Sequence, residues 1–87
     1  MDLAATIRQR LAALDPVALE LEDESGRHVG HAGAASGGSH FRLTLVSPRF
    51  AGKGTRERHR MVYAALGDLM ERDIHALAIN ARAPDEL

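Results

Sequence analysis

Five histidines are the residues of this 87-residue chain whose chemistry is most readily put to use. Neutral imidazole is a common ligand for iron, zinc and copper, and its proton is gained or lost near neutral pH. A single loop histidine, however, is more often a solvated surface residue than a ligand, so the number alone predicts no site. The five are His28, His31, His40, His59 and His75.

Each histidine has a structural alternative to metal binding. His28 and His31 can chelate a divalent metal, but two ligands without a visible third are weak support for a site. His59 follows Arg58 in a helical pattern, where it can simply pack or cap. His75 precedes a strand pattern, where its imidazole can hydrogen-bond a nearby carbonyl. The residue pattern leaves these alternatives open.

The elements that position these histidines follow from the apolar spacing. Helical spacing predicts two helices, with Asp2 and Thr55 as capping residues, and alternation predicts three strands. The glycine-rich stretch between Glu24 and Ser39 predicts a long loop, which in a small domain is usually disordered or functional. The expected helices are 3–14 and 56–72, the strands 17–23, 41–45 and about 76–79, and a last helical turn begins at Pro84.

This order predicts an α+β fold of the type αββαβ(α) in a single domain spanning residues 1–87. The first two strands pair as an antiparallel hairpin around the loop, and the third lies parallel after a right-handed helical crossover. The result is a three-stranded mixed sheet with helices packed on one face. The expected centre of the core is Leu43, Leu45, Val62, Leu66, Leu77 and Ile79.

The composition of the chain excludes several classes of partner and ligand. A net charge of −1 provides no global field toward nucleic acid or membrane, and the absence of cysteine excludes disulfides and thiolate ligands. No apolar run approaches the roughly 20 residues that span a bilayer, and no basic and apolar leader is visible, so we expect a cytoplasmic protein without a membrane partner. Asp23, Glu24, Ser25 and His28 combine catalytic residue types, but a glycine-rich loop preorganises no geometry, and we expect no enzyme.

Several short strings, taken together, are specific. They are DES at 23–25, GSHF at 38–41, VSPRFAG at 46–52, RHRMVY at 58–63 and IHALAI at 74–79. The pattern FxGxxxxxRHxxVxxxL at 50–66 and HAL at 75–77 are the most distinctive. From Ile7 to about Glu86 the chain closely resembles the BolA-like protein family.

This resemblance implies a class II KH-like fold and a partner, a monothiol glutaredoxin of the Cys-Gly-Phe-Ser type. The two proteins share a [2Fe-2S] cluster whose remaining ligands come from the glutaredoxin and glutathione, and the isolated chain binds none. We therefore expect a monomer alone and a heterodimer with glutaredoxin, serving cluster maturation and trafficking or iron homeostasis. The implied ligands are His75 and, because the loop has no cysteine, His28, with His31 as the alternate.

The resemblance also implies a second class of function, because some BolA-like proteins are transcriptional regulators in stress responses. A basic group around the start of the second helix can contact DNA phosphates, although a solvated helix start is the favoured explanation of these residues. The Gly-x-x-Gly string at 30–33 lies between strands rather than between helices, so we interpret it as coincidence. The basic group is Arg49, Lys53, Arg56, Arg58 and Arg60.

Overall fold

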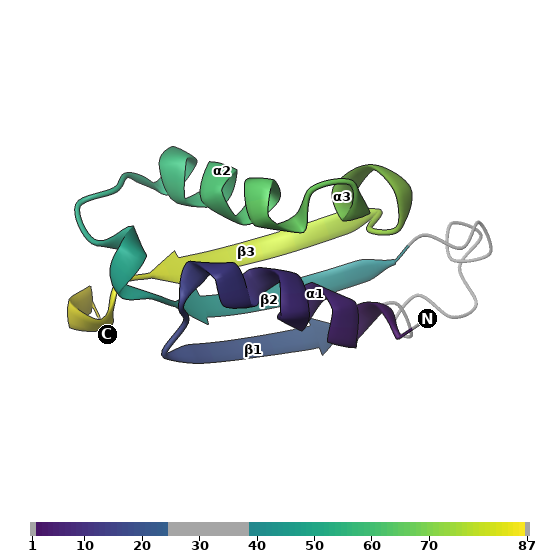
Figure 1. Ribbon diagram of the computed structural model, residues 1–87, viewed down its shortest axis with the longest axis horizontal. Helices are drawn as coiled ribbons and strands as arrows, with labels where there is room; N and C mark the ends of the chain where they lie inside the picture. Colours follow the sequence, from purple (N-terminus) through teal and green to yellow (C-terminus); the bar gives the residue numbers. More distant parts are fainter. Residues whose placement is uncertain (1, 25–38, 87) are drawn as a thin grey trace.

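The computed structural model describes residues 2–24 and 39–86, and its element order confirms the predicted αββαβ(α) arrangement (Figure 1). The expected loop ligands His28 and His31 lie outside the described residues. No helix in the described part of the chain is both long and apolar enough to cross a bilayer. The elements are α1 (Leu3–Leu11), η1 (Ala12–Leu14), β1 (Ala18–Asp23), β2 (His40–Val46), η4 (Pro48–Phe50), α2 (Thr55–Leu66), α3 (Leu69–Arg72), β3 (Ala76–Arg82) and η5 (Pro84–Glu86), where η marks a 3-10 helix.

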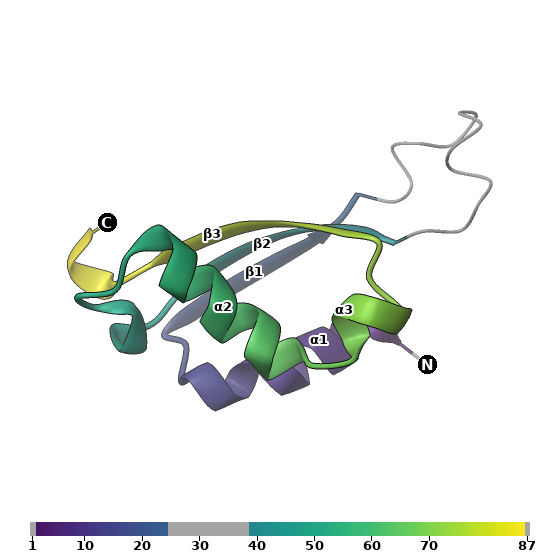
Figure 2. The same cartoon turned by 90° about the horizontal axis from the view of Figure 1, so that it is seen from above.

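The sheet has the order β1-β2-β3, with β2 in the centre. β1 pairs antiparallel with β2, and β2 pairs parallel with β3, in a register that places Leu43 beside both Leu21 and Ile79. Seen from above, α1 and α2 lie on the same face of the sheet (Figure 2). The predicted three-stranded mixed sheet with helices on one face is therefore confirmed.

The first helix begins as predicted and ends in a tighter turn. Asp2 caps it, because a carboxylate oxygen of Asp2 accepts a hydrogen bond from the Ala5 amide at 3.2 Å. The predicted continuous helix to Leu14 is instead an α-helix to Leu11 followed by the 3-10 turn η1. Asp15, with a φ of 51°, then reverses the chain toward β1.

The second helix differs from the prediction of one helix over 56–72. It ends at Leu66, because Gly67 has a φ of 57° and a ψ of −130°, and the chain resumes as α3 at Leu69. Only glycine adopts such a conformation readily. The prediction that Thr55 caps this helix is also wrong. Thr55 is the first residue of α2, and the capping position is occupied by Gly54, which has no side chain to accept a hydrogen bond.

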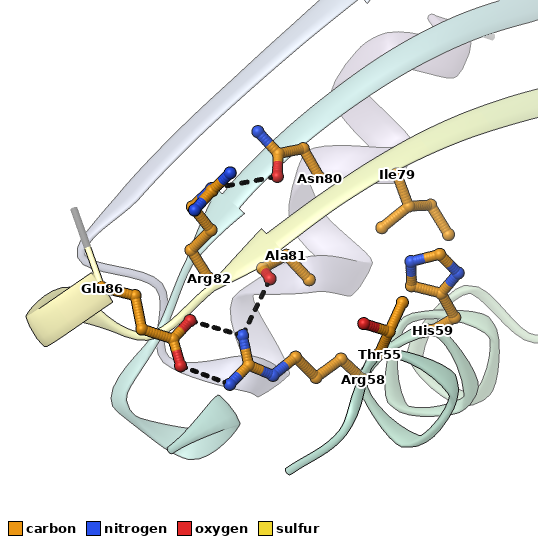
Figure 3. Close-up of a pocket in the computed structure, with 8 residues that line it drawn as sticks. All are labelled: Thr55, Arg58, His59, Ile79, Asn80, Ala81, Arg82 and Glu86. Atoms are coloured by element: carbon orange, nitrogen blue, oxygen red, sulfur yellow. Dashed lines mark hydrogen bonds and ion pairs between the residues drawn. The ribbon is translucent and has the colours of Figure 1, made fainter. Parts of the chain in front are cut away.

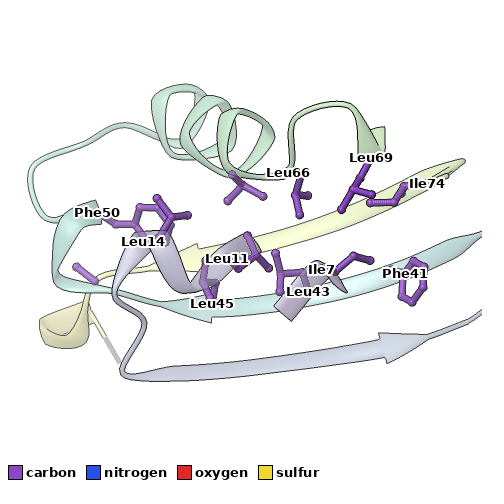
Figure 4. Packing of buried hydrophobic residues seen from close by; sticks show 12 residues of the cluster. Ile7, Leu11, Leu14, Phe41, Leu43, Leu45, Phe50, Leu66, Leu69 and Ile74 are labelled. Carbon is purple, nitrogen blue, oxygen red and sulfur yellow. The ribbon is translucent and has the colours of Figure 1, made fainter. Parts of the chain in front are cut away.

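The core lies between the sheet and the helices (Figure 4). Leu43, Leu45, Val62 and Leu66, four of the six predicted central residues, are fully buried, which confirms them. The other two, Leu77 and Ile79, are only partly buried, because β3 is an edge strand and β2 alone has neighbours on both sides. The other buried apolar residues are Ile7, Leu11, Leu14, Phe41, Val46, Phe50, Leu69, Ile74 and Ala83.

Candidate functional site

The backbone around His75 is held on both sides. The residue before it, Ile74, is buried, and its amide donates a hydrogen bond to the Leu69 carbonyl at 2.8 Å. The His75 and Ala76 amides both donate to the carbonyl of Ser39, at 2.8 and 3.0 Å. The side chain of His75 itself is exposed. This histidine therefore combines a fixed backbone with an imidazole that solvent and other molecules can reach.

A second histidine lies against His75. His40 is the first residue of β2, and its partner in the parallel register is Ala76, the residue after His75. The two imidazole rings have centroids 5.1 Å apart and planes at 31°. The sequence pattern assigns no role to His40. The signal that could have revealed the pair is that each histidine stands at the start of one of two strands expected to be parallel.

The same end of the sheet carries the two ends of the segment 25–38. Glu24 follows β1, and its amide donates a hydrogen bond to the carbonyl of His40 at 2.8 Å. Ser39 precedes β2. The side chain of Glu24 also forms an ion pair with Arg42, with a nitrogen–oxygen distance of 3.4 Å. The covalent chain thus connects the segment containing His28 and His31 to the end of the sheet where His40 and His75 lie.

The ligand set at this end is incomplete by itself. Within residues 2–24 and 39–86, no group of three or more histidine, aspartate or glutamate side chains could hold a metal ion. A metal bound at His75 would therefore need further ligands from outside these residues, from water or from a partner. The chemistry of a neutral imidazole fits iron, zinc and copper alike.

The predicted basic group is largely engaged in ion pairs within the protein. The Arg49 guanidinium bonds the Asp15 carboxylate at 2.6 and 2.7 Å, and Lys53 lies 3.6 Å from the carboxylate of Glu57. Of the predicted basic residues, Arg56 and Arg60 make no ion pair within the described part of the chain, and both are exposed. Arg56 and Arg60 are therefore the members of the group most available for phosphate contact.

Arg58 has a structural role. Its two terminal nitrogens each donate to one carboxylate oxygen of Glu86 at 2.6 Å, and one of them also donates to the carbonyl of Ala81 (Figure 3). Its Nε donates to the carbonyl of Lys53. Hydrogen bonds donated by Arg58, and to a smaller extent by the Ala83 amide, lower the pKa of Glu86 to about 2. The hydrogen bonds that Arg58 donates to Glu86 raise the pKa of Arg58. This pair attaches the C-terminal turn η5 to the start of α2.

A small polar hollow adjoins this pair. Its volume is about 230 Å³, and His59 and Thr55 from α2 face Asn80 and Arg82 from β3 across it (Figure 3). His59 is half-buried there. The described histidines are thus divided between two places, with His40 and His75 paired at one end of the sheet and His59 apart from them.

Comparison with known proteins identifies relatives along most of the chain. The model of the family described as BolA-like protein matches residues 11–86. BolA-like protein 1 of Bos taurus is 48% identical over 81 residues, which cover 92% of this chain and 58% of that protein. SufE-like protein 1, chloroplastic/mitochondrial, of Arabidopsis thaliana is 46% identical over 87 residues, which cover 93% of this chain but 24% of that protein. The chain thus spans about a quarter to three fifths of the length of these two relatives.

Two further comparisons bear on the function and the fold. The DNA-binding transcriptional regulator BolA of Escherichia coli is 44% identical over 79 residues, covering 85% of this chain and 72% of that protein. The solved BolA domain of SufE1 from Arabidopsis thaliana is 42% identical, covers the whole chain and 98% of that domain, and superposes with a TM-score of 0.85. The predicted α+β architecture is therefore the one found in this solved BolA domain.

Proposed function

The chain belongs to the BolA-like protein family, and from this premise we propose that it is a non-enzymatic partner of a monothiol glutaredoxin, with which it shares a His-ligated [2Fe-2S] cluster. The observation that carries the proposal is the environment of His75, whose backbone is anchored and whose imidazole is exposed. A ligand on such a rigid element is preorganised, so binding a metal costs little ordering. The proposed role is cluster maturation and trafficking or the regulation of iron homeostasis.

The donor set fits a shared cluster. The described residues provide histidine nitrogens but no complete metal site, which suits a cluster whose other ligands come from glutaredoxin and glutathione. When bound, such a cluster supplies one-electron chemistry, and nitrogen ligands raise its reduction potential relative to thiolates. His75 would bind iron through a neutral imidazole nitrogen and would release it on protonation.

The second ligand in this proposal is His28, with His31 as the alternate. His28 is four residues after Glu24, which lies at the same end of the sheet as His75. Four residues of extended chain span up to about 14 Å, so the chain is long enough for His28 to reach this end of the sheet. His31 is three residues further along the same segment and can replace His28.

The test is the absorption spectrum of the chain co-expressed with a monothiol glutaredoxin and purified with glutathione. We expect a brown heterodimer with the bands of a [2Fe-2S] cluster, and we expect His75→Ala to abolish the His-ligated spectrum. His59→Ala is the matched control, because His59 is a half-buried imidazole away from this end of the sheet. Circular dichroism checks that each variant is folded. An unchanged spectrum and pH dependence in folded His75→Ala would refute the ligand assignment.

A DNA-binding regulator is the second candidate function, and the observation that favours it is the 44% identity to the Escherichia coli regulator. Arg49, Lys53 and Arg58 are paired with carboxylates, so Arg56 and Arg60 are the members of the basic group most available for phosphate contact. Two phosphate contacts correspond to a slope of about −2 in log K against log salt, which is weak nonspecific binding. Fluorescence anisotropy with duplex DNA over a salt series measures this slope. Nanomolar, sequence-specific binding at physiological salt would rank the regulator first.

A further inference from the structure

We infer that His40 and His75 form a two-imidazole site for a single divalent ion of the zinc class, which the chain binds without any partner. The inference starts from the contact between the two rings at 5.1 Å, a pair that the proposed cluster ligation does not use. It shares His75 with the proposed cluster site but depends on neither glutaredoxin nor glutathione.

The spacing of the rings suits a common metal ion. Zinc binds imidazole nitrogen at roughly 2.0–2.1 Å, and the ring centre lies about 1.1 Å beyond the nitrogen. Two imidazoles on one tetrahedral ion therefore have their centres about 5 Å apart. The observed separation of 5.1 Å agrees with this value. The angle of 31° between the planes imposes no obstacle, because each ring can rotate about its metal–nitrogen bond.

The backbone keeps the pair together. The carbonyl of Ser39, the residue before His40, accepts hydrogen bonds from both His75 and Ala76. His40 is further fixed by the parallel ladder to Ala76 on one side and by the Glu24 amide on the other. The Cα atoms of the two histidines therefore cannot separate without breaking these hydrogen bonds, so little ordering is needed when a metal binds.

Within the described part of the chain, His75 is exposed and His40 is half-buried. The strand neighbour of His40 is Ala76, whose methyl group is small. Glu24, whose amide donates to the His40 carbonyl, forms an ion pair with Arg42. With two protein nitrogens, water would complete the coordination of the ion. The ion and a shared cluster would exclude each other, because both require His75.

The test uses the isolated, metal-free chain in a background that carries His28→Gln and His31→Gln, which leaves His40, His59 and His75. Isothermal titration with Zn²⁺ near neutral pH should show one ion per chain. His40→Gln and His75→Gln should each weaken binding by about tenfold or more, since each leaves one imidazole. His59→Gln is the matched control and should leave the affinity unchanged. The double variant should bind hardly more weakly than either single variant.

A second measurement does not depend on the variants being folded. Cu²⁺ bound to the background chain should show electron paramagnetic resonance couplings from two imidazole nitrogens. A single nitrogen, or a loss of affinity in His59→Gln as large as in His40→Gln, would overturn the inference, as would unchanged Zn²⁺ affinity in folded His40→Gln. No glutaredoxin is present, so failure here leaves the proposed cluster function intact, and failure of the cluster experiment leaves this site intact.

Discussion

At the scale of single residues, two of the histidines have backbones that hydrogen bonds hold in place. His75 and His40 are anchored through the carbonyl of Ser39 and the β2–β3 ladder. His28 and His31 lie outside the described residues and share one segment of the chain. A ligand on a rigid element is preorganised by its backbone, so its position is specific. A ligand that shares its segment with a second histidine can be replaced by that histidine.

This difference predicts how the loop histidines respond to substitution in the glutaredoxin complex. His28→Ala should weaken or reshape the cluster spectrum without abolishing it, because His31 is three residues away and can take its place. The double variant His28→Ala/His31→Ala should lose the His-ligated spectrum. Absorption and circular dichroism spectra of the purified complexes measure both. A double variant that retains the spectrum of the unmodified complex would exclude both residues as ligands.

The Arg58–Glu86 pair predicts a dependence of stability on acid. The pKa of Glu86 is about 2 in the folded chain, below its ordinary value of 4.5, so the ionised carboxylate favours the folded state. This contribution is fully present above about pH 4.5 and is lost as the pH falls toward 2. Glu86→Gln should therefore flatten the fall in the free energy of unfolding across this window.

Urea titrations at several pH values from 2 to 6 measure that fall. Asp85→Asn is the matched control, because Asp85 is an exposed carboxylate on the same turn and makes no hydrogen bond to Arg58. The assignment would be wrong if the unmodified chain and Glu86→Gln lost stability equally between pH 4.5 and 2.

At the scale of elements, the break between α2 and α3 shapes the path to His75. Ending α2 at Leu66 lets Leu69 reach the core and lets its carbonyl accept the Ile74 amide, which directs the chain into β3. The break requires a backbone conformation that L-residues rarely adopt, and Gly67 supplies it. The guanidinium of Arg10 from α1 also donates to the Leu66 carbonyl at 3.1 Å, so the end of the helix is satisfied by a neighbouring helix.

Gly67→Ala should consequently destabilise the fold by about 1–3 kcal/mol. The cost comes from the positive φ, because the new Cβ atom would make only an ordinary contact, at 3.4 Å, with a terminal nitrogen of Arg10. Gly54→Ser is the matched control, because Gly54 has open space for a side chain and a φ of −76°, and serine is a good capping residue there. Chemical denaturation of both variants measures the difference. Equal stability of Gly67→Ala and the unmodified chain would contradict this account of the break.

At the scale of the whole molecule, the core is independent of the histidines. The buried apolar cluster joins α1, η1, β2, η4, α2 and α3, and it contains no titratable side chain. Folding therefore requires no metal, and it does not depend on the protonation state of the imidazoles at the end of the sheet. Metal binding there would stabilise the chain only through mass action on the folded state.

We therefore expect the metal-free chain to be folded and to unfold cooperatively, as measured by far-ultraviolet circular dichroism in the presence of a chelator. Leu43→Ala should cost about 2–5 kcal/mol, because Leu43 is fully buried on the central strand. Leu77→Ala is the comparison variant and should cost less, because Leu77 is only partly buried on the edge strand β3. A disordered spectrum in the metal-free sample would show that the core does not suffice.

The sequence by itself determined the order of the elements, the mixed sheet, the cap at Asp2 and four fully buried residues of the core. Its short strings also identified the family and singled out His75. These features are readable because burial of one face imposes a local period on the apolar residues, and because capping and family motifs lie within a few consecutive positions.

Only the tertiary structure decided which residues meet across the fold. The contact of His40 with His75 depends on the register of two parallel strands, and the Arg58–Glu86 pair depends on where the C-terminal turn lies. The break at Gly67 also overrides a helical period that continues through it in the sequence. Such features depend on neighbours distant along the chain and on backbone angles, and neither leaves a periodic trace in the order of the residues.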